Sequence, residues 1–196
     1  MSEIVFSTDI GVVFSSYFEN EENEDFRLQL NQPSRKKGAE TYSARVLNHW
    51  EKEGVIGDLR DGGRGWRKYS QLDRIWIQLV QQLRAFGYPL VNIKQLKEAI
   101  DNEALLEFAV SYVKLQKQSL RFLVTAGTNP QFALLSDQGW PDDTDPPKAY
   151  LELDVDGLLN EVSLLTLQHS KEKLVDSEQE ETKYQSKMFQ YFNKTD

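Results

Sequence analysis

The chain has 196 residues, of which 39 % are hydrophobic and 28 % are charged, so it can bury a core beneath a soluble surface. It contains no cysteine, which excludes disulfides, thiolate nucleophiles and zinc sites built on sulfur. The net charge of -8 conceals a basic centre, because residues 34–100 carry thirteen Lys or Arg against seven Asp or Glu while both flanks are acidic. Such a local basic field is what a polyanion-binding surface needs.

Residues 1–33 form an acidic segment that we expect to contribute a helix. Apolar side chains between residues 4 and 18 recur at helical spacing, with Ser7 or Thr8 as a possible cap. Their β-branched content leaves a strand open as the alternative. The polar residues 19–25 read as a loop, and a basic linker follows at residues 32–38.

Residues 34–102 show the order helix, hairpin, helix, tight turn, helix. Ser43 is placed to cap a helix from Ala44 to about Glu53, which Gly54 ends. Glycines and then alternating aromatic and basic residues over 57–69 predict a β-hairpin with an exposed tip. The stripes expected to face the core comprise Val46, Leu47 and Trp50, then Trp66, then Leu72, Ile75, Trp76, Leu79, Leu83 and Phe86, then Leu90, Ile93, Leu96 and Ile100.

The helix after the hairpin is expected to start with a capping box formed by Ser70 and Asp73 and to stop at residues 87–89. Residues 103–168 then predict a small α/β region. It holds a helix over 105–116, short strands near residues 120–124, 131–135 and 149–153, and a helix from about Val155 to Leu167. Residues 169–196 read as a charged helix or tail. The predicted fold class is therefore α+β, with two or three helices and a few strands in the C-terminal region.

Three stretches within residues 41–100 resemble the MerR family of winged helix-turn-helix proteins. Residues 47–56 (LNHWEKEGVI) are similar to the end of its recognition helix, Arg60 with residues 65–70 (GWRKYS) to its wing, and residues 83–93 to the turn between its next two helices. The chain departs from the family where Asn48 replaces an arginine. The helix that should precede Ser43 is also missing, unless Thr8–Val12 opens it, and so is the long dimerisation helix.

The resemblance implies a sequence-specific regulator of transcription that binds double-stranded DNA as a homodimer. Arg45 and Asn48 would read base edges, Arg pairing with guanine and Asn with adenine. Arg64, Arg67 and Lys68 would neutralise phosphates. Glu51 would lie partly buried against a cation of the wing or of the following helix. The full set of predicted DNA-binding residues is Ser43, Arg45, Asn48, His49, Arg60, Arg64, Arg67, Lys68 and Tyr69, of which Tyr69 could equally serve in packing.

The region 101–168 is expected to form the dimer contact or to receive a signal. The apolar surfaces assigned to the contact are the helix over 105–116, the strands at Leu120 and Phe132, and a helix with Leu158, Leu159, Val162 and Leu165. Two alternatives stay open: an excisionase-like or plasmid accessory DNA-binding protein, and a protein-interaction module that does not bind DNA.

Other classes of function find little support in the sequence. No phosphate-cradling glycine loop with Lys and no nucleophile with a matching base is recognisable, so we expect no enzyme activity, cofactor or metal. No apolar run approaches the roughly 20 residues of a membrane span. The acidic start lacks the pattern of a secretory signal, so the expected location is the cytoplasm.

Overall fold

The computed structural model describes residues 4–19, 24–33, 42–58, 60, 65–102, 104–116, 118–125, 130–141 and 145–160. The chain divides into two compact units, Met1–Val162 and Ser163–Asp196, and every described residue belongs to the first. The predictions for the basic linker, for Arg64 at the wing tip, for the end of the helix near Leu167 and for the charged tail lie outside the described residues.

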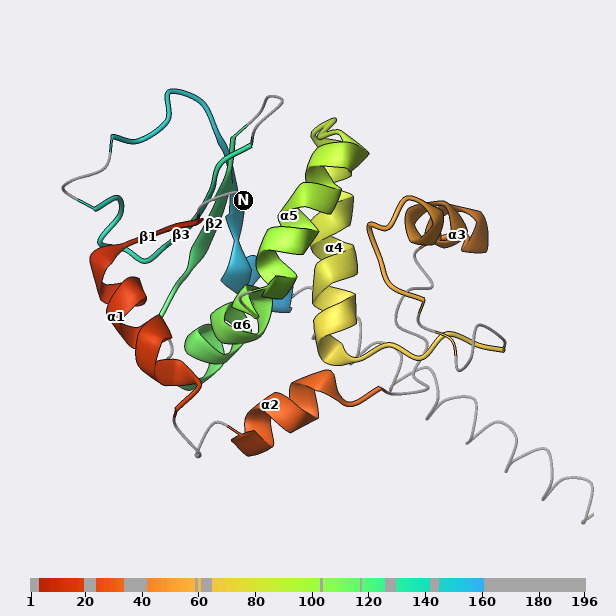
Figure 1. The fold of residues 1–196 in the computed structure, drawn as a ribbon, viewed down its shortest axis with the longest axis horizontal. Coiled ribbons are helices and arrows are strands. Elements are labelled where there is room, and N and C mark those ends of the chain that lie inside the picture. The colour runs from red at the N-terminus through yellow and green to blue at the C-terminus, as the bar shows by residue number, and fades with distance from the viewer. Residues whose placement is uncertain are drawn as a thin grey trace, which may run out of the picture. The chain divides into compact units, whose positions relative to one another are not determined.

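One unit of the chain is built on a four-stranded sheet with the strand order β1-β3-β2-β4 (Figure 1). The antiparallel pair β2 and β3 forms its centre, β4 runs antiparallel to β2, and β1 runs parallel to β3. Apart from Arg121 at the start of β2, the side chains of both central strands are apolar and buried, as expected of strands covered on both faces. The strands are β1 (Ile4–Phe6), β2 (Arg121–Val124), β3 (Phe132–Leu135) and β4 (Leu151–Asp154).

The N-terminal segment is part of this sheet. Ile4 pairs with Phe132 and Phe6 with Leu134, so β1 occupies the residues where the sequence favoured a helix and left a strand as the alternative. Helix α1 (Thr8–Tyr17) begins only after Ser7. The buried Ser7 hydroxyl does not cap the helix but accepts a bond from the Ser136 amide at 3.0 Å, which fastens the strand–helix junction to the end of β3.

Helices cover one face of the sheet. Helix α1 contacts β1, and helix α2 (Glu24–Asn31) packs on helix α6 (Leu105–Gln116) (Figure 1). The fully buried Phe108 of α6 takes edge-on contacts from Phe14 and Tyr17 of α1 at centroid distances of 4.9 and 5.2 Å. Each such aromatic pair contributes about 0.5–1.5 kcal/mol of stability beyond the effect of the area it buries. These contacts hold α1 against α6, beside the sheet.

The predicted helices of the central segment are present. They are α3 (Ala44–Lys52), α4 (Gln71–Ala85) and α5 (Leu90–Asn102). The capping box at the start of α4 is confirmed, since Ser70 Oγ accepts from the Asp73 amide at 3.0 Å and Asp73 Oδ2 accepts from the Ser70 amide at 2.7 Å. Gly87, with a φ of +79°, makes the turn into α5.

A large hydrophobic core joins the central segment to one face of the sheet. It runs from Ile10 of α1 through Leu79 of α4 and Leu96 of α5 to Leu158 behind β4. The apolar positions that the sequence assigned to a dimer contact lie in this core where the structure describes them, since Leu105, Leu120, Phe132, Leu158 and Leu159 are at most 2 % exposed. These particular side chains are therefore used within the chain and are not free for a dimer contact, whereas the role of residues 103–168 stays a prediction.

Other predicted core positions lie at the surface. Phe86 is 66 % exposed at the turn between α4 and α5, Val46 is 36 % exposed, and Trp66 is 93 % exposed. The apolar pattern predicted their burial, but such a pattern does not show where a neighbouring element ends. None of the helices in the part of the chain that the structure describes is long and apolar enough to cross a bilayer.

Candidate nucleic-acid interface

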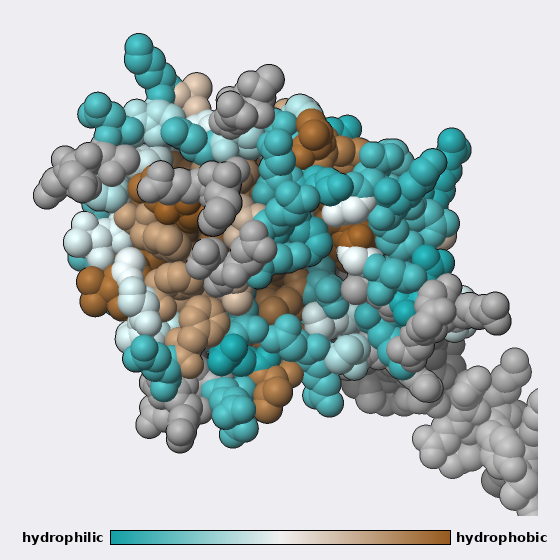
Figure 2. All heavy atoms as spheres, in the orientation of Figure 1, coloured by the Kyte–Doolittle hydropathy of each residue, from teal (hydrophilic) through white to brown (hydrophobic). Residues whose placement is uncertain are grey.

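Helix α3 buries one side and presents the other to solvent. Leu47 and Trp50 are 4 and 6 % exposed, and the Trp50 ring lies 5.4 Å from that of Tyr42. Ser43 caps the helix as predicted, since its hydroxyl accepts from the Val46 amide at 3.4 Å. The exposed side carries four polar side chains: Arg45, Asn48, His49 and Lys52. The surface around α3 is correspondingly hydrophilic (Figure 2).

The end of α3 is anchored to α4. Gly54, with a φ of +74°, turns the chain so that Val55 and Ile56 become buried. The Val55 carbonyl then accepts a hydrogen bond from the indole nitrogen of the buried Trp76 at 2.8 Å. This bond and the apolar side of α3 fix the exposed residues of the helix relative to the core.

Glu51 is the acceptor at the centre of an ion-pair cluster that we call the Glu51 cluster, made of Asn48, Glu51, Arg60 and Arg67. Arg67 donates from Nε to Oε1 at 2.7 Å and from a terminal nitrogen to Oε2 at 2.9 Å. Arg60 donates to the same Oε2 at 2.8 Å. The Glu51 side chain is only 11 % exposed, so the predicted burial of this carboxylate against a wing cation is confirmed.

The same Arg67 nitrogen that bonds Glu51 Oε2 also donates to Oδ1 of Asn48. The Arg67 side chain is 14 % exposed, and its hydrogen bond to Glu51 raises its pKa further above the ordinary value. Arg60 is 29 % exposed and pairs with Asp58 at 2.9 Å as well. Both arginines were predicted to contact DNA, but in this structure they join the wing to α3 instead of pointing at solvent.

Residues 41–100 match the family model described as the MerR HTH family regulatory protein. This segment is similar to a MerR helix-turn-helix domain, and we call residues 41–100 the MerR domain from here on. The match confirms the resemblance for this part of the 196-residue chain. No curated protein and no solved structure matches the chain.

The MerR domain begins in the structure at Tyr42, directly before α3. The alternative that Thr8–Val12 supplies its first helix is wrong, because these residues belong to α1, whose rings pack on Phe108 of α6. Figure 1 places α1 beside the sheet, with α4 and α5 between it and α3. The long dimerisation helix of the family has no counterpart directly after α5, where the 12-residue α6 enters the core.

The wing of the MerR domain is described only at its base. Trp66 stands almost fully exposed after Gly65, whose φ is +88°. Tyr69 is 6 % exposed, and burial raises its pKa, so its ring serves in packing. Lys68 is half-buried. Residues 59 and 61–64, including Arg64, lie outside the described part of the wing, so the β-hairpin stays a prediction.

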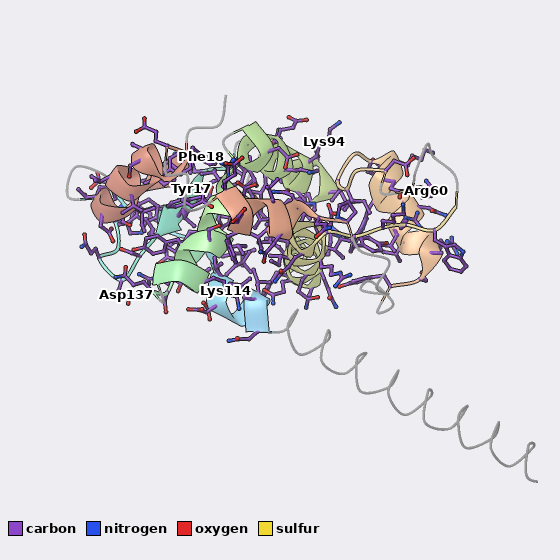
Figure 3. All side chains as sticks on the ribbon, turned by 90° about the horizontal axis from the view of Figure 1, so that it is seen from below. Tyr17, Phe18, Arg60, Lys94, Lys114 and Asp137 are labelled. Atoms are coloured by element: carbon purple, nitrogen blue, oxygen red, sulfur yellow. The ribbon has the colours of Figure 1, made fainter. Side chains whose placement is uncertain are left out.

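Lys94 is a cation near α3 that the sequence did not single out. It lies on the exposed side of α5, and a Cβ at Gly54 would be 3.4 Å from its Cε and 3.5 Å from its Nζ. Figure 3 shows Lys94 and Arg60 toward the α3 end of this unit, with Asp137 toward the sheet end. No local signal marks Lys94, because its position depends on how α5 packs beside the end of α3.

Proposed function

We propose that this chain is a sequence-specific DNA-binding regulator of transcription that places α3 in the major groove. The observation that carries the proposal is that the MerR domain exposes the polar side of α3 while Leu47 and Trp50 anchor the opposite side in the core. A major groove about 12 Å wide admits an α-helix. Arg45 in the first turn of α3 and Asn48 one turn later are then the side chains available to base edges.

Contacts to phosphates supply the affinity in this proposal. The exposed Lys52 and Lys94 flank the end of α3, and Lys68 follows in the wing. Because Arg60 and Arg67 are already paired with Glu51, they act by holding the wing in place. We therefore expect fewer released counterions than the number of basic residues in the segment implies.

We further propose that the regulator acts as a dimer. One short helix reads only a few base pairs, which is too little to select a site in a genome, and two-fold dimers place two helices about 34–36 Å apart. Light scattering on the full chain at low and high protein concentration measures the stoichiometry. A monomer under all conditions, with or without DNA, contradicts this part of the proposal.

The experiment that tests DNA binding is a salt titration with labelled duplex DNA, first of random sequence and then of the sequences that the chain selects. Each phosphate that is neutralised contributes a slope of about -0.9 in log K against log salt. We expect Lys52→Gln to make the slope less steep by about one such contact. The matched control is Lys114→Gln, which removes an exposed cation from α6 on the sheet side, and it should leave the slope unchanged.

A slope near zero for the natural chain would support the protein-interaction module and contradict the regulator. The location of the selected sites in a genome then separates a regulator, with sites at promoters, from an accessory protein of a mobile element, with sites at recombination junctions.

A further inference from the structure

Asn48 occupies the exposed side of α3, and its carboxamide has two different ends. The oxygen accepts hydrogen bonds and the amino group donates them. A guanidinium can only donate, so the atom of Asn48 that faces Arg67 is Oδ1. The remaining end of the carboxamide, Nδ2, carries the two hydrogens that can reach a ligand.

The orientation is held by the rest of the Glu51 cluster. Nε and a terminal nitrogen of Arg67 both bond the Glu51 carboxylate, at 2.7 and 2.9 Å. Moving Arg67 away from Asn48 would break the pairing of a carboxylate that is 11 % exposed, and leaving such a group without its partner is costly. Arg67 is therefore a fixed donor beside Asn48.

We propose that Arg67 makes Asn48 a donor-only reader, so that α3 selects guanine at the base pair that Asn48 contacts. The inference rests on the proposed DNA-binding function. Guanine presents two acceptors, N7 and O6, on its major-groove edge, and both suit the amino group of Asn48. The usual partner of asparagine is adenine, which offers N7 as an acceptor and N6 as a donor.

Adenine is disfavoured here because of the Arg67 guanidinium. Oδ1 of Asn48 keeps a second lone pair that could accept a hydrogen bond. An adenine N6 amino group bound there would lie beside the Arg67 guanidinium, so two hydrogen-bond donors would face each other. Guanine brings O6, an acceptor, to the same place. This outcome differs from the adenine contact that the sequence suggested for Asn48, and Arg67 is accordingly a positioning residue for base recognition.

Selection of bound sequences from random duplex DNA tests the proposal on the full chain and on three variants at two positions. The natural chain should enrich one guanine by at least about 5-fold over adenine, which is the lower end of what a good base contact provides. Asn48→Ala should lose the preference at that position alone. Asn48→Asp, which offers only acceptors, should replace guanine by cytosine, whose N4 amino group donates. Arg67→Lys, which lacks the planar guanidinium fork that holds Glu51 and Asn48 together, should admit adenine beside guanine.

Lys114→Gln is the control, because it changes an exposed residue of α6 outside the proposed DNA-binding surface and should keep the guanine. The inference is overturned, while DNA binding stands, if the natural chain selects adenine and Asn48→Ala loses that preference. It is also overturned if Asn48→Asp still selects guanine. The absence of any selected sequence overturns both the inference and the proposed function. Because Asn48 is exposed, we expect its variants to fold. Their selected sequences therefore test the guanine preference even if Arg67→Lys loosens the wing.

Discussion

Replacing Glu51 by glutamine tests whether the Glu51 cluster holds the wing against α3. Gln keeps the size of the side chain but removes the charge and brings an amino group toward two guanidinium donors. Three hydrogen bonds to charged groups are affected, two from Arg67 and one from Arg60. A buried bond of this kind contributes about 1.5–3 kcal/mol, whereas an exposed ion pair contributes at most about 1 kcal/mol.

The exposure of the partners decides the magnitude. The side chains of Glu51 and Arg67 are 11 and 14 % exposed, whereas that of Arg60 is 29 % exposed, so solvent screens the Arg60 pair more than the Arg67 pair. We therefore expect Glu51→Gln to lower the free energy of unfolding by about 2 kcal/mol in total. For a chain of this size that corresponds to a melting temperature lower by about 4–8 °C.

Urea unfolding followed by circular dichroism measures this change. The matched control is Glu53→Gln at the C-terminal end of the same helix, because the side chains of Glu53 and its partner His49, 3.8 Å apart, are 46 and 56 % exposed. That variant should lose less than about 0.5 kcal/mol. The loss in Glu51→Gln should also persist at high salt, since salt screens partly buried pairs less than exposed ones. Equal losses in the two variants would refute the reasoning.

Three further predictions concern single side chains. Ser70→Ala should lower the free energy of unfolding by about 0.5–2 kcal/mol in thermal melts, because the hydroxyl that accepts from Asp73 is removed; an unchanged melt would contradict the cap. Trp66→Ala should change stability by less than about 0.5 kcal/mol yet remove the tryptophan fluorescence that acrylamide quenches most readily, since Trp66 is 93 % exposed; unchanged quenching would argue against that exposure. Burial raises the pKa of Tyr88 to about 12, so the folded chain keeps a proton there that the unfolded chain releases near pH 10, and stability should fall as the pH rises from about 10 to 12. Tyr88→Phe should make this fall less steep in pH-dependent urea melts, and an identical slope would contradict the shift.

The local features of the MerR domain could be predicted from the sequence. The Ser43 cap, the Ser70–Asp73 capping box and the turn at Gly87 depend on residues within three or four positions of one another. Helix stripes such as Ile75, Leu79 and Leu83 follow from the period of 3.6 residues. These signals survive in a single sequence because the physical interactions that produce them are local.

The sequence did not predict which side chains pair across longer separations. For the Glu51 cluster, the sequence predicted only that Glu51 would be partly buried against a cation of the wing or of the following helix. The contact from Arg67 to Asn48 spans 19 positions. Arg67 was assigned to phosphates because an arginine in a basic hairpin is typically solvated. The exposure of Trp66 and Phe86 was missed for a related reason, since hydrophobic periodicity identifies a stripe but not where the neighbouring element ends.

The sequence by itself determined the α+β class, the MerR domain and the polar side of α3 that faces solvent, because helix periodicity, caps and family motifs are written in neighbouring residues. Only the tertiary structure decided that β1 joins β3 across more than a hundred residues, that the α/β region shares a core with the MerR domain, and that Arg67 donates to Oδ1 of Asn48. Strand pairing, shared burial and charge neutralisation depend on distances in space, and those distances exist only once the chain has folded.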